Sequence, residues 1–525
     1  MKRTAYILTA ALFSCVLIVA QTTEIDGLKF IQSDISGTAR YVSMAGAFGA
    51  LGGDASAIKD NPAGLGIYRS SELTTTLNIY TQNSKSTWGG VKSGSDRYNS
   101  KFDNFTYVIS SPTWNQLNER GKGLLFSNFS FSYNRLKNFD KNVSISGEMW
   151  NSSMSDYMAH LVTGAEKGNG ILIGPGDMSF ENIDVSWLSV IGFEGFLINE
   201  TTDGWQSEVK GEKVKPQYSL SESGSVNEYA FAWSGNFGNR FYLGASLNIQ
   251  SINYHIYSNY REDFVGRNGN FNLKNEYSTS GIGSNIKIGA IFQPADFMRL
   301  GLSYQTPTFL SIDEVYYPSL EYDLTHSVEG KVSGSIIPRY DNGGQMKGSS
   351  ESKIKNPAQL NASIAYLFGK KGLFSAEYVF NNYGAMKYYN SNGVVELGST
   401  DEAANKNMKN ILQSGHTIKI GGEFRATDQL SLRAGFATAT AATQPNATKE
   451  MFNNTIRTDS EYFLHKGSYY ITAGLGYKGR GWYIDFAWMN KTVNEEFRPY
   501  NTDDIPLAEV ITQNNNFLAT FGLRF

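Results

Sequence analysis

From about residue 71 to its carboxyl end, the sequence repeats one pattern: segments of about ten residues alternate apolar and small polar side chains, and breaks rich in Gly, Asn, Asp or Ser follow them. Such alternation indicates β-strands with two different faces. The pattern predicts 14 strands, at residues 73–80, 104–111, 124–134, 227–234, 241–254, 283–292, 299–305, 359–368, 373–381, 417–425, 430–438, 469–477, 482–489 and 517–525.

The breaks between these segments alternate in length after the third strand. Short links are expected at residues 236–240, 293–297, 369–372, 426–429 and 478–481, and long ones at 136–225, 258–275, 307–357, 388–413, 441–466 and 491–514. Short turns at one end and long loops at the other are typical of bacterial outer-membrane barrels. A soluble β-sandwich, which is the alternative fold, has no reason to separate its loops in this way.

The two faces of the expected strands differ sharply in polarity. Phe129, Phe131 and Tyr133 share one face of the third strand, while Asn and Ser residues occupy the other. Several apolar faces end in Trp or Tyr, as expected of aromatic girdles at membrane interfaces. The same parity places eight charges on the polar faces, where we expect them to line a lumen and pair across strands: Lys287, Glu377, Lys419, Glu423, Arg425, Arg433, Asp485 and Arg524.

The amino end predicts export. Lys2 and Arg3 precede an almost uncharged apolar run that ends at Ala20, which is typical of a signal peptide over residues 1–20. Cys15, the single cysteine, loosely imitates a lipid-attachment site, but it lies inside the apolar run instead of closing it. Removal of the signal peptide would therefore exclude disulfides and thiolate chemistry.

Composition and motifs exclude several classes of function. The net charge is −3 and no cluster of Lys and Arg occurs, so a nucleic-acid partner is not expected. The common hydrolase, metalloprotease and calcium-binding motifs do not occur, and the five histidines are scattered, so we expect neither an enzyme, nor a metal site, nor a cofactor. Haem uptake has weak support because no His pair is placed to ligate iron.

The segment before the first strand differs from the rest, because residues 21–70 do not alternate. Small residues dominate its centre, and the glycines there fit neither a dinucleotide-binding nor a Walker motif. Asp54 is expected to cap a short helical turn that extends through Ile58, and Pro62 prevents helix from continuing through Asn61. These features predict a compact plug of tight turns that packs closely against a barrel wall.

The run from Met44 to Gly66, with Asn61, Pro62 and Ala63 at its core, resembles the amino-terminal hatch of the FadL-type transporters of long-chain fatty acids and hydrocarbons. Gly301–Pro307 also resembles a strand ending of that family. The resemblance implies a 14-stranded barrel in the bacterial outer membrane whose lumen is plugged by the hatch. It assigns Asn61, Pro62 and Ala63 to hatch gating, although a buried structural turn is the simpler interpretation of the same residues.

By the same resemblance, extracellular loops capture a hydrophobic solute. The long excursion at about 136–225 contains helical spacing over residues 153–167 and an apolar run over 185–198. We assign capture to Trp187, Phe193 and Phe196, while a small core of the loop itself remains the alternative. Family members release solute through a wall opening at a kinked early strand, but Phe126–Asn134 contains no Gly or Pro that would place such a kink.

Together, these observations predict an all-β, transmembrane, antiparallel barrel of 14 strands over residues 71–525, with a small hatch at 21–70 and long extracellular loops that contain short helices. The expected function is uptake of hydrophobic or amphipathic small molecules of the fatty-acid or hydrocarbon type. The expected partners are such ligands and outer-membrane lipids. Two alternatives remain open: a docking component that binds a secretion-system protein, and a general porin.

Overall fold

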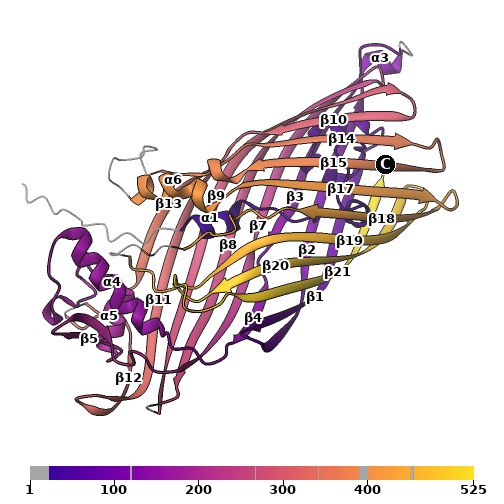
Figure 1. Ribbon diagram of the computed structural model, residues 1–525. Helices are drawn as coiled ribbons and strands as arrows, with labels where there is room; N and C mark the ends of the chain where they lie inside the picture. The colour runs from indigo at the N-terminus through magenta and orange to yellow at the C-terminus, as the bar shows by residue number, and fades with distance from the viewer. Residues whose placement is uncertain are drawn as a thin grey trace, which may run out of the picture.

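The computed structural model describes residues 23–118, 121–266, 268–340, 342–389, 400–449, 451 and 455–525. The expected signal peptide at residues 1–20 lies outside the described residues and stays a prediction. The described chain forms one closed antiparallel barrel (Figure 1). Its 14 wall strands are β1 (Glu72–Trp88), β2 (Val91–Pro112), β3 (Leu124–Asn138), β7 (Val214–Phe237), β8 (Phe241–Phe264), β9 (Gly269–Ala295), β10 (Met298–Gln305), β14 (Gln359–Leu367), β15 (Gly372–Asn382), β17 (Ser414–Arg425), β18 (Leu430–Ala439), β19 (Tyr462–Lys478), β20 (Trp482–Arg498) and β21 (Ala508–Arg524).

The barrel closes between its first and last strands. β1 pairs with β21 from Glu72 opposite Arg524 to Thr87 opposite Glu509. Closure leaves no open sheet edge. The backbone N–H and C=O groups of an open edge would find no hydrogen-bond partners in hydrocarbon. The predicted 14-stranded antiparallel barrel is therefore confirmed.

Four wall strands continue past a short interruption. β3 resumes as β4 (Lys141–Ser146), β10 as β11 (Thr308–His326), β14 follows β13 (Gly348–Asn356), and β15 resumes as β16 (Lys387–Tyr389) after a turn, η4 (Tyr383–Ala385). Pro307 and Pro357 occupy two of these breaks, because proline has no N–H to donate to a ladder. β11 also forms an outer hairpin with β12 (Gly330–Ile336).

The expected strands are correctly placed, but several of them are too short. Residues 258–275, expected as a long loop, form the ends of β8 and β9, which pair up to Phe264 opposite Gly269. The excursion expected at 136–225 is likewise shorter, since β3 runs to Asn138 and β7 begins at Val214. Outside the apolar belt a strand no longer needs one apolar face, so the alternation that marks it in the sequence fades.

The outer surface of the barrel carries a belt of exposed apolar side chains. Ile282, Ile286 and Ile288 alternate along β9, and Phe517, Phe521 and Leu523 alternate along β21; their exposed fractions lie between 39% and 61%. So large an exposed apolar area would be costly in water, whereas lipid tails cover it at no such cost. No helix among the described residues is long and apolar enough to cross a membrane.

Residues 23–69 fill the interior of the barrel with two helices and two 3-10 turns. These are α1 (Glu24–Ile31), α2 (Ala39–Ser43), η1 (Ala55–Lys59) and η2 (Pro62–Ile67). Each begins at a capping side chain: Thr23, Thr38, Asp54 and Asn61 accept hydrogen bonds from the first-turn backbone. The turn that we expected after Asp54 is confirmed.

The remaining elements form an outer layer at the loop end of the barrel, opposite the short turns and α3 (Trp114–Leu117) (Figure 1). Between β4 and β7 lie α4 (Met154–Asn169), η3 (Pro175–Asp177), α5 (Trp187–Glu194) and a hairpin of β5 (Ile198–Thr201) with β6 (Gly204–Ser207). We call residues 147–213 the outer excursion. A sixth helix, α6 (Thr400–Ile411), precedes β17.

Candidate functional site

The interior segment rests on a set of wall glycines. A Cβ atom added to any of six glycines, one from each of six strands, would overlap the interior segment between Ser43 and Ala63: Gly244, Gly289, Gly301, Gly421, Gly435 and Gly474. Because packed interiors have no spare room for an additional methyl group, each of these positions requires glycine. The wall is therefore shaped to hold this segment, as expected for a plug.

Asn61, Pro62 and Ala63 lie at the closest of these contacts. Asn61 is fully buried; its Nδ2 donates to the carbonyl of Gly49 at 2.7 Å and its Oδ1 accepts from the N–H of Ala63 at 3.0 Å. Asn61 Nδ2 also lies 3.3 Å from the carbonyl of Ala290 in β9. This turn thus joins the interior segment to the wall, and its assignment to gating stays a prediction.

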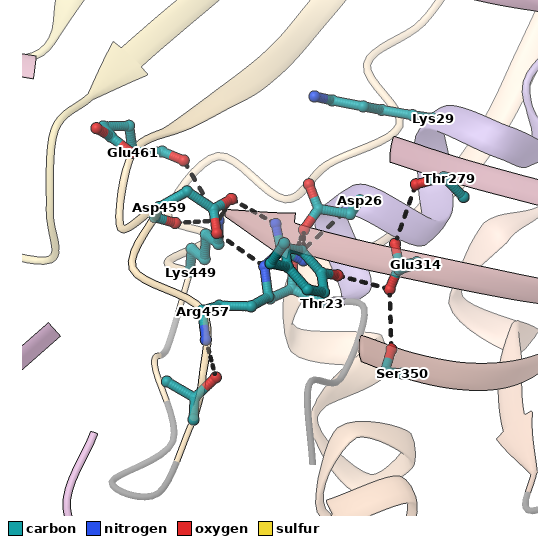
Figure 2. Close-up of polar contacts among 12 residues, drawn as sticks. Thr23, Asp26, Lys29, Thr279, Glu314, Ser350, Lys449, Arg457, Asp459 and Glu461 are labelled. Carbon is teal, nitrogen blue, oxygen red and sulfur yellow. Dashed lines mark hydrogen bonds and ion pairs between the residues drawn. The ribbon is translucent and has the colours of Figure 1, made fainter. Parts of the chain in front are cut away.

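The other end of the interior segment is held by a loop at the loop end of the barrel. The guanidinium of Arg457, which is 1% exposed, donates to Asp26 Oδ2 of α1 at 2.6 Å and to Asp459 Oδ1 at 2.8 Å. Lys449 lies 3.0 Å from Asp459 Oδ2. Figure 2 shows Arg457 between Asp26 and Asp459, and we call these four residues the α1 latch.

Electrostatics keep the α1 latch charged although it is buried. Burial alone would raise the pKa of Asp26, but Arg457 and Lys449 outweigh that effect and hold the pKa of this carboxyl well below its ordinary value. The pKa of the nearby Glu461 shifts in the opposite direction. Burial, and to a smaller extent the charge of Asp459, raise this pKa to about 8. Neither carboxylate oxygen of Glu461 has a hydrogen-bond partner among the described residues.

A cavity of about 190 Å³ lies between α1 and the wall. Its apolar lining comes from Ile25, Leu28, Phe139, Phe463 and Val493, and four lysines also reach it: Lys29, Lys137, Lys141 and Lys491. A smaller cavity of about 110 Å³ adjoins it and extends to Lys59 and Asp60. The space can hold an aromatic ring or a head group, since a cavity of about 150 Å³ accommodates benzene.

The plug separates this space from the turn end of the barrel. A third cavity of about 320 Å³ lies there, and it is lined by Arg40, Gly52 and Asp54 of the interior segment and by wall residues such as Arg299 and Arg524. It shares no lining residue with the two upper cavities. Among the described residues, the plug therefore lies between the upper cavities and the turn-end cavity.

Three of the four upper-cavity lysines are neutralised by carboxylates. Lys29 pairs with Glu222 at 2.8 Å, Lys141 with Glu495 at 2.6 Å and Lys491 with Asp34 at 2.6 Å. Lys137 instead donates to the carbonyl of Lys29 at 2.9 Å and has no ion pair within the described ranges. Lys137 is therefore the cation best placed to meet an anionic head group.

Most of the lumenal charges predicted from strand parity pair as expected. Lys419 lies 2.9 Å from Glu377, and Arg433 lies 2.7 Å from Glu423 and 2.6 Å from Asp485. Two partners were not foreseen in the sequence: Glu228 pairs with Lys287 at 2.8 Å, and Glu72 with Arg524 at 2.6 Å. Arg425 is exposed and lines the turn-end cavity.

The wall contains a seam that sequence reasoning did not locate. The ladder between β2 and β3 runs from Pro112 opposite Phe126 to Asn104 opposite Asn134 and stops there. Residues 91–102 of β2 pair with β1 alone, while β4 stays on β7. β3 is interrupted at Phe139 and Asp140, which lie near the bend at Gly224 of β7, where φ is +113°.

Side chains, not backbone bonds, close the seam between β2 and β4. Arg97 lies 3.1 Å from Asp140 and donates to the carbonyl of Glu222 at 2.6 Å. Asn99 Nδ2 donates to Asp140 Oδ2 at 3.1 Å, and Ser95 donates to the carbonyl of Asn142 at 2.8 Å. Phe139 and Asp140 also line the upper cavity, so the seam lies directly beside it.

The three residues assigned to capture lie in the apolar interior of the outer excursion. Trp187 is 2% exposed and donates to the carbonyl of Phe180 at 2.9 Å. The ring of Phe193 packs edge-on against Trp205, and that of Phe196 packs against Tyr322 of β11. Trp187 is buried, whereas Phe193 and Phe196 are partly exposed, and the role of all three in capture stays a prediction.

Among the described residues, no group of three or more His, Cys, Asp or Glu side chains could hold a metal ion. The buried carboxylates are paired with cations, bonded to tyrosine and serine hydroxyls, or isolated.

Comparison with known proteins supports the fold. No protein-family model matches the chain, and no curated protein matches it. A FadL homologue of Pseudomonas aeruginosa has a similar structure, with a TM-score of 0.54 at 13% identity over 94% of this chain and 99% of that one. The toluene transporter TodX of Pseudomonas putida is also similar, with a TM-score of 0.47 at 12% identity over 94% and 100%. The first of these likenesses establishes a FadL-type fold.

Proposed function

We propose that this chain is an outer-membrane channel for the uptake of hydrophobic or amphipathic small molecules. The observation that carries the proposal is the position of the upper cavity: it is partly apolar, it is cut off from the turn end by the plug, and it lies beside an unladdered wall seam. A hydrophilic solute would need an open aqueous path, and the plug blocks that path. A hydrophobic solute can leave the cavity sideways into the membrane.

The solute class follows from the lining of the cavity. Ile25, Leu28 and Phe139 offer apolar contact, whereas Lys137 offers a positive charge without a carboxylate partner among the described residues. An amphiphile with a carboxylate head matches both, because an ammonium and a carboxylate form a strong charge-assisted hydrogen bond. The volume of a long acyl tail exceeds the cavity volume of about 190 Å³, so the tail would extend into the seam.

In this account the outer excursion collects solute, the plug prevents leakage, and the seam between β2 and β4 is the lateral exit. We propose that hatch gating is a movement of Asn61, Pro62 and Ala63 away from Gly244 and Gly289 that precedes release through the seam. We propose transport without catalysis.

Locking the seam tests the function. In proteoliposomes, uptake of a fluorescent long-chain fatty acid should fall to background when N99C and D140C are oxidised to a disulfide, and should return on reduction. A matched control pair, N104C and N134C, joins strands that are already laddered and should leave uptake unchanged. Equal uptake with the seam locked and free would reject lateral release, and free passage of a sugar would favour a porin.

A docking function is the second candidate, and the outer excursion favours it. Residues 147–213 carry 11 acidic side chains against three lysines, and Leu172 is 91% exposed. Such a surface suits a basic protein partner. Copurification of a stoichiometric partner with the full chain but not with a chain lacking the exposed acids, together with normal solute uptake by both, would favour docking.

A further inference from the structure

A groove lies on the outer surface of the barrel, at the edge of the apolar belt nearer the loop end. It measures about 570 Å³ and extends over β8, β9, β11, β13 and β16. The side chains that face outward along it are Ile249, Ile282, Ser284, Phe309, Ser311, Lys353 and Tyr389. Toward the loop end, the next outward residues are polar, namely Ser280 beyond Ile282 and Ser311 beyond Phe309. The groove therefore lies where lipid tails give way to head groups.

Two lysines face each other at the edge of this groove. Lys355 of β13 is opposite Lys387 of β16 in the ladder between these strands. The ammonium of Lys355 lies 5.7 Å from the centre of the exposed Phe309 ring, so Lys355 projects outward, and Lys387 shares its face. Opposite residues of an antiparallel ladder have Cβ atoms about 4.5–5.5 Å apart, and like charges at such positions destabilise the pairing.

No residue that the structure describes neutralises this pair of lysines. Neither Lys355 nor Lys387 forms an ion pair within the described ranges. Asp313 and Glu351 face each other two outward positions further toward the loop end, and Lys353 lies between them and Lys355. The ladder thus holds two positive charges side by side at the membrane edge, where an anion would relieve their repulsion.

We propose that the groove binds a phosphorylated acyl lipid of the leaflet at the loop end. Its phosphate lies between Lys355 and Lys387, because one phosphate has enough acceptor oxygens to bond both ammonium groups. Its acyl chain lies in the groove along Phe309 and Ile282. The groove volume falls within the range of about 300–1,000 Å³ that is usual for ligand sites.

This lipid site is separate from the solute path. The groove shares no lining residue with the upper cavity, which lies inside the barrel. Lipid binding on the outer surface and solute binding in the upper cavity can therefore be tested independently.

The position of the lysines indicates what a bound lipid does. β16 has three residues, and it joins β13 through three residue pairs, from Lys353 opposite Tyr389 to Lys355 opposite Lys387. A phosphate that bridges Lys355 and Lys387 would fasten this short ladder. The lipid should consequently stabilise the wall where β15 is interrupted and resumes as β16.

Native mass spectrometry of the full-length protein in detergent tests this proposal. The probes are dimyristoyl phosphatidic acid and dimyristoyl phosphatidylcholine, which have the same tails and different head groups. The wild type should retain one phosphatidic acid in preference to phosphatidylcholine, and its thermal midpoint should rise with phosphatidic acid. K355Q combined with K387Q should weaken this binding on the order of tenfold, because two charge-assisted hydrogen bonds are lost.

A matched control removes two lysines elsewhere. Lys370 and Lys371 are exposed in the turn between β14 and β15, at the other end of the barrel, and K370Q combined with K371Q should bind phosphatidic acid as the wild type does. K355R combined with K387R keeps both charges and should retain binding, which separates loss of charge from a folding defect.

A further variant tests the groove itself. S284W places a large side chain in the groove and leaves both lysines unchanged, so it should also weaken binding of phosphatidic acid. The proposal is overturned if K355Q with K387Q binds phosphatidic acid as tightly as the wild type, or if both double glutamine variants lose it equally. Displacement of the lipid by millimolar inorganic phosphate would show a site for free phosphate and would also overturn it.

Discussion

At the scale of single residues, the contact between Gly289 and Asn61 determines how tightly the plug fits. A Cβ at position 289 would overlap Asn61 Oδ1 and press on Pro62. G289A should therefore displace this turn, weaken its bonds to Gly49 and Ala290, and raise ion conductance in planar bilayers. The expected loss of stability is about 1–3 kcal/mol, as for other overpacked positions.

Gly94 supplies the control for this substitution. It lies in β2, and a Cβ there would meet only the carbonyl of Ser84 at an ordinary 3.4 Å. G94A should keep the conductance of the wild type. If G289A conducts no more than G94A, the turn at Asn61 does not seal the lumen.

Glu461 makes stability depend on pH. Its folded pKa of about 8 lies above the ordinary value of 4.5, so the native state holds a proton that the unfolded chain has lost over that interval. Stability should consequently fall as pH rises from about 4.5 to about 8. E461Q mimics the protonated side chain. Its free energy of unfolding, measured with denaturant, should therefore depend less on pH across this range than that of the wild type.

The exposed residue Glu329 provides the comparison, and E329Q should retain the profile of the wild type. An E461Q profile as steep as that of the wild type would show that Glu461 is already ionised in the fold.

At the scale of elements, the α1 latch couples a loop to the plug. Breaking a buried ion pair leaves an uncompensated charge and costs about 3 kcal/mol, so D26N and R457Q should each speed hydrogen exchange of the α1 amides on the order of 100-fold. The double variant should add little to either single one, since both remove the same contact.

K466Q is the matched control, because Lys466 and Glu496 form a partly exposed pair at 3.0 Å. Exposed pairs contribute little to stability, so exchange in α1 should not change. Additive effects of D26N and R457Q would mean that the two residues act separately.

An element can be predicted from the sequence when the constraint that shapes it acts on residues that are close together in the chain. Strands such as 283–292 are evident because lipid on one side and polar lumen on the other impose strict alternation. The seam is not evident, because it depends on which strands stay paired above Asn104, and the sequence pattern places Phe139 and Asp140 in the expected long excursion. The Arg457 contact with Asp26 joins residues that are far apart in the chain, and no local pattern reports such a pair.

At the scale of the whole molecule, the upper cavity lies between the loops and the plug, and the seam lies at its side. Loops and the outer excursion pack into one apolar cluster with α1 above the upper cavity, and the plug separates that cavity from the turn end. A solute held there therefore meets the side chains of the seam before it meets any open path. We propose that this cavity binds an amphiphile.

Diffraction from crystals soaked with a fatty acid that carries bromine along its tail tests that claim most directly. An anomalous bromine peak is expected between Phe139 and the seam, with the carboxylate toward Lys137. Bromine peaks confined to the outer apolar belt, with none inside the barrel, would contradict it.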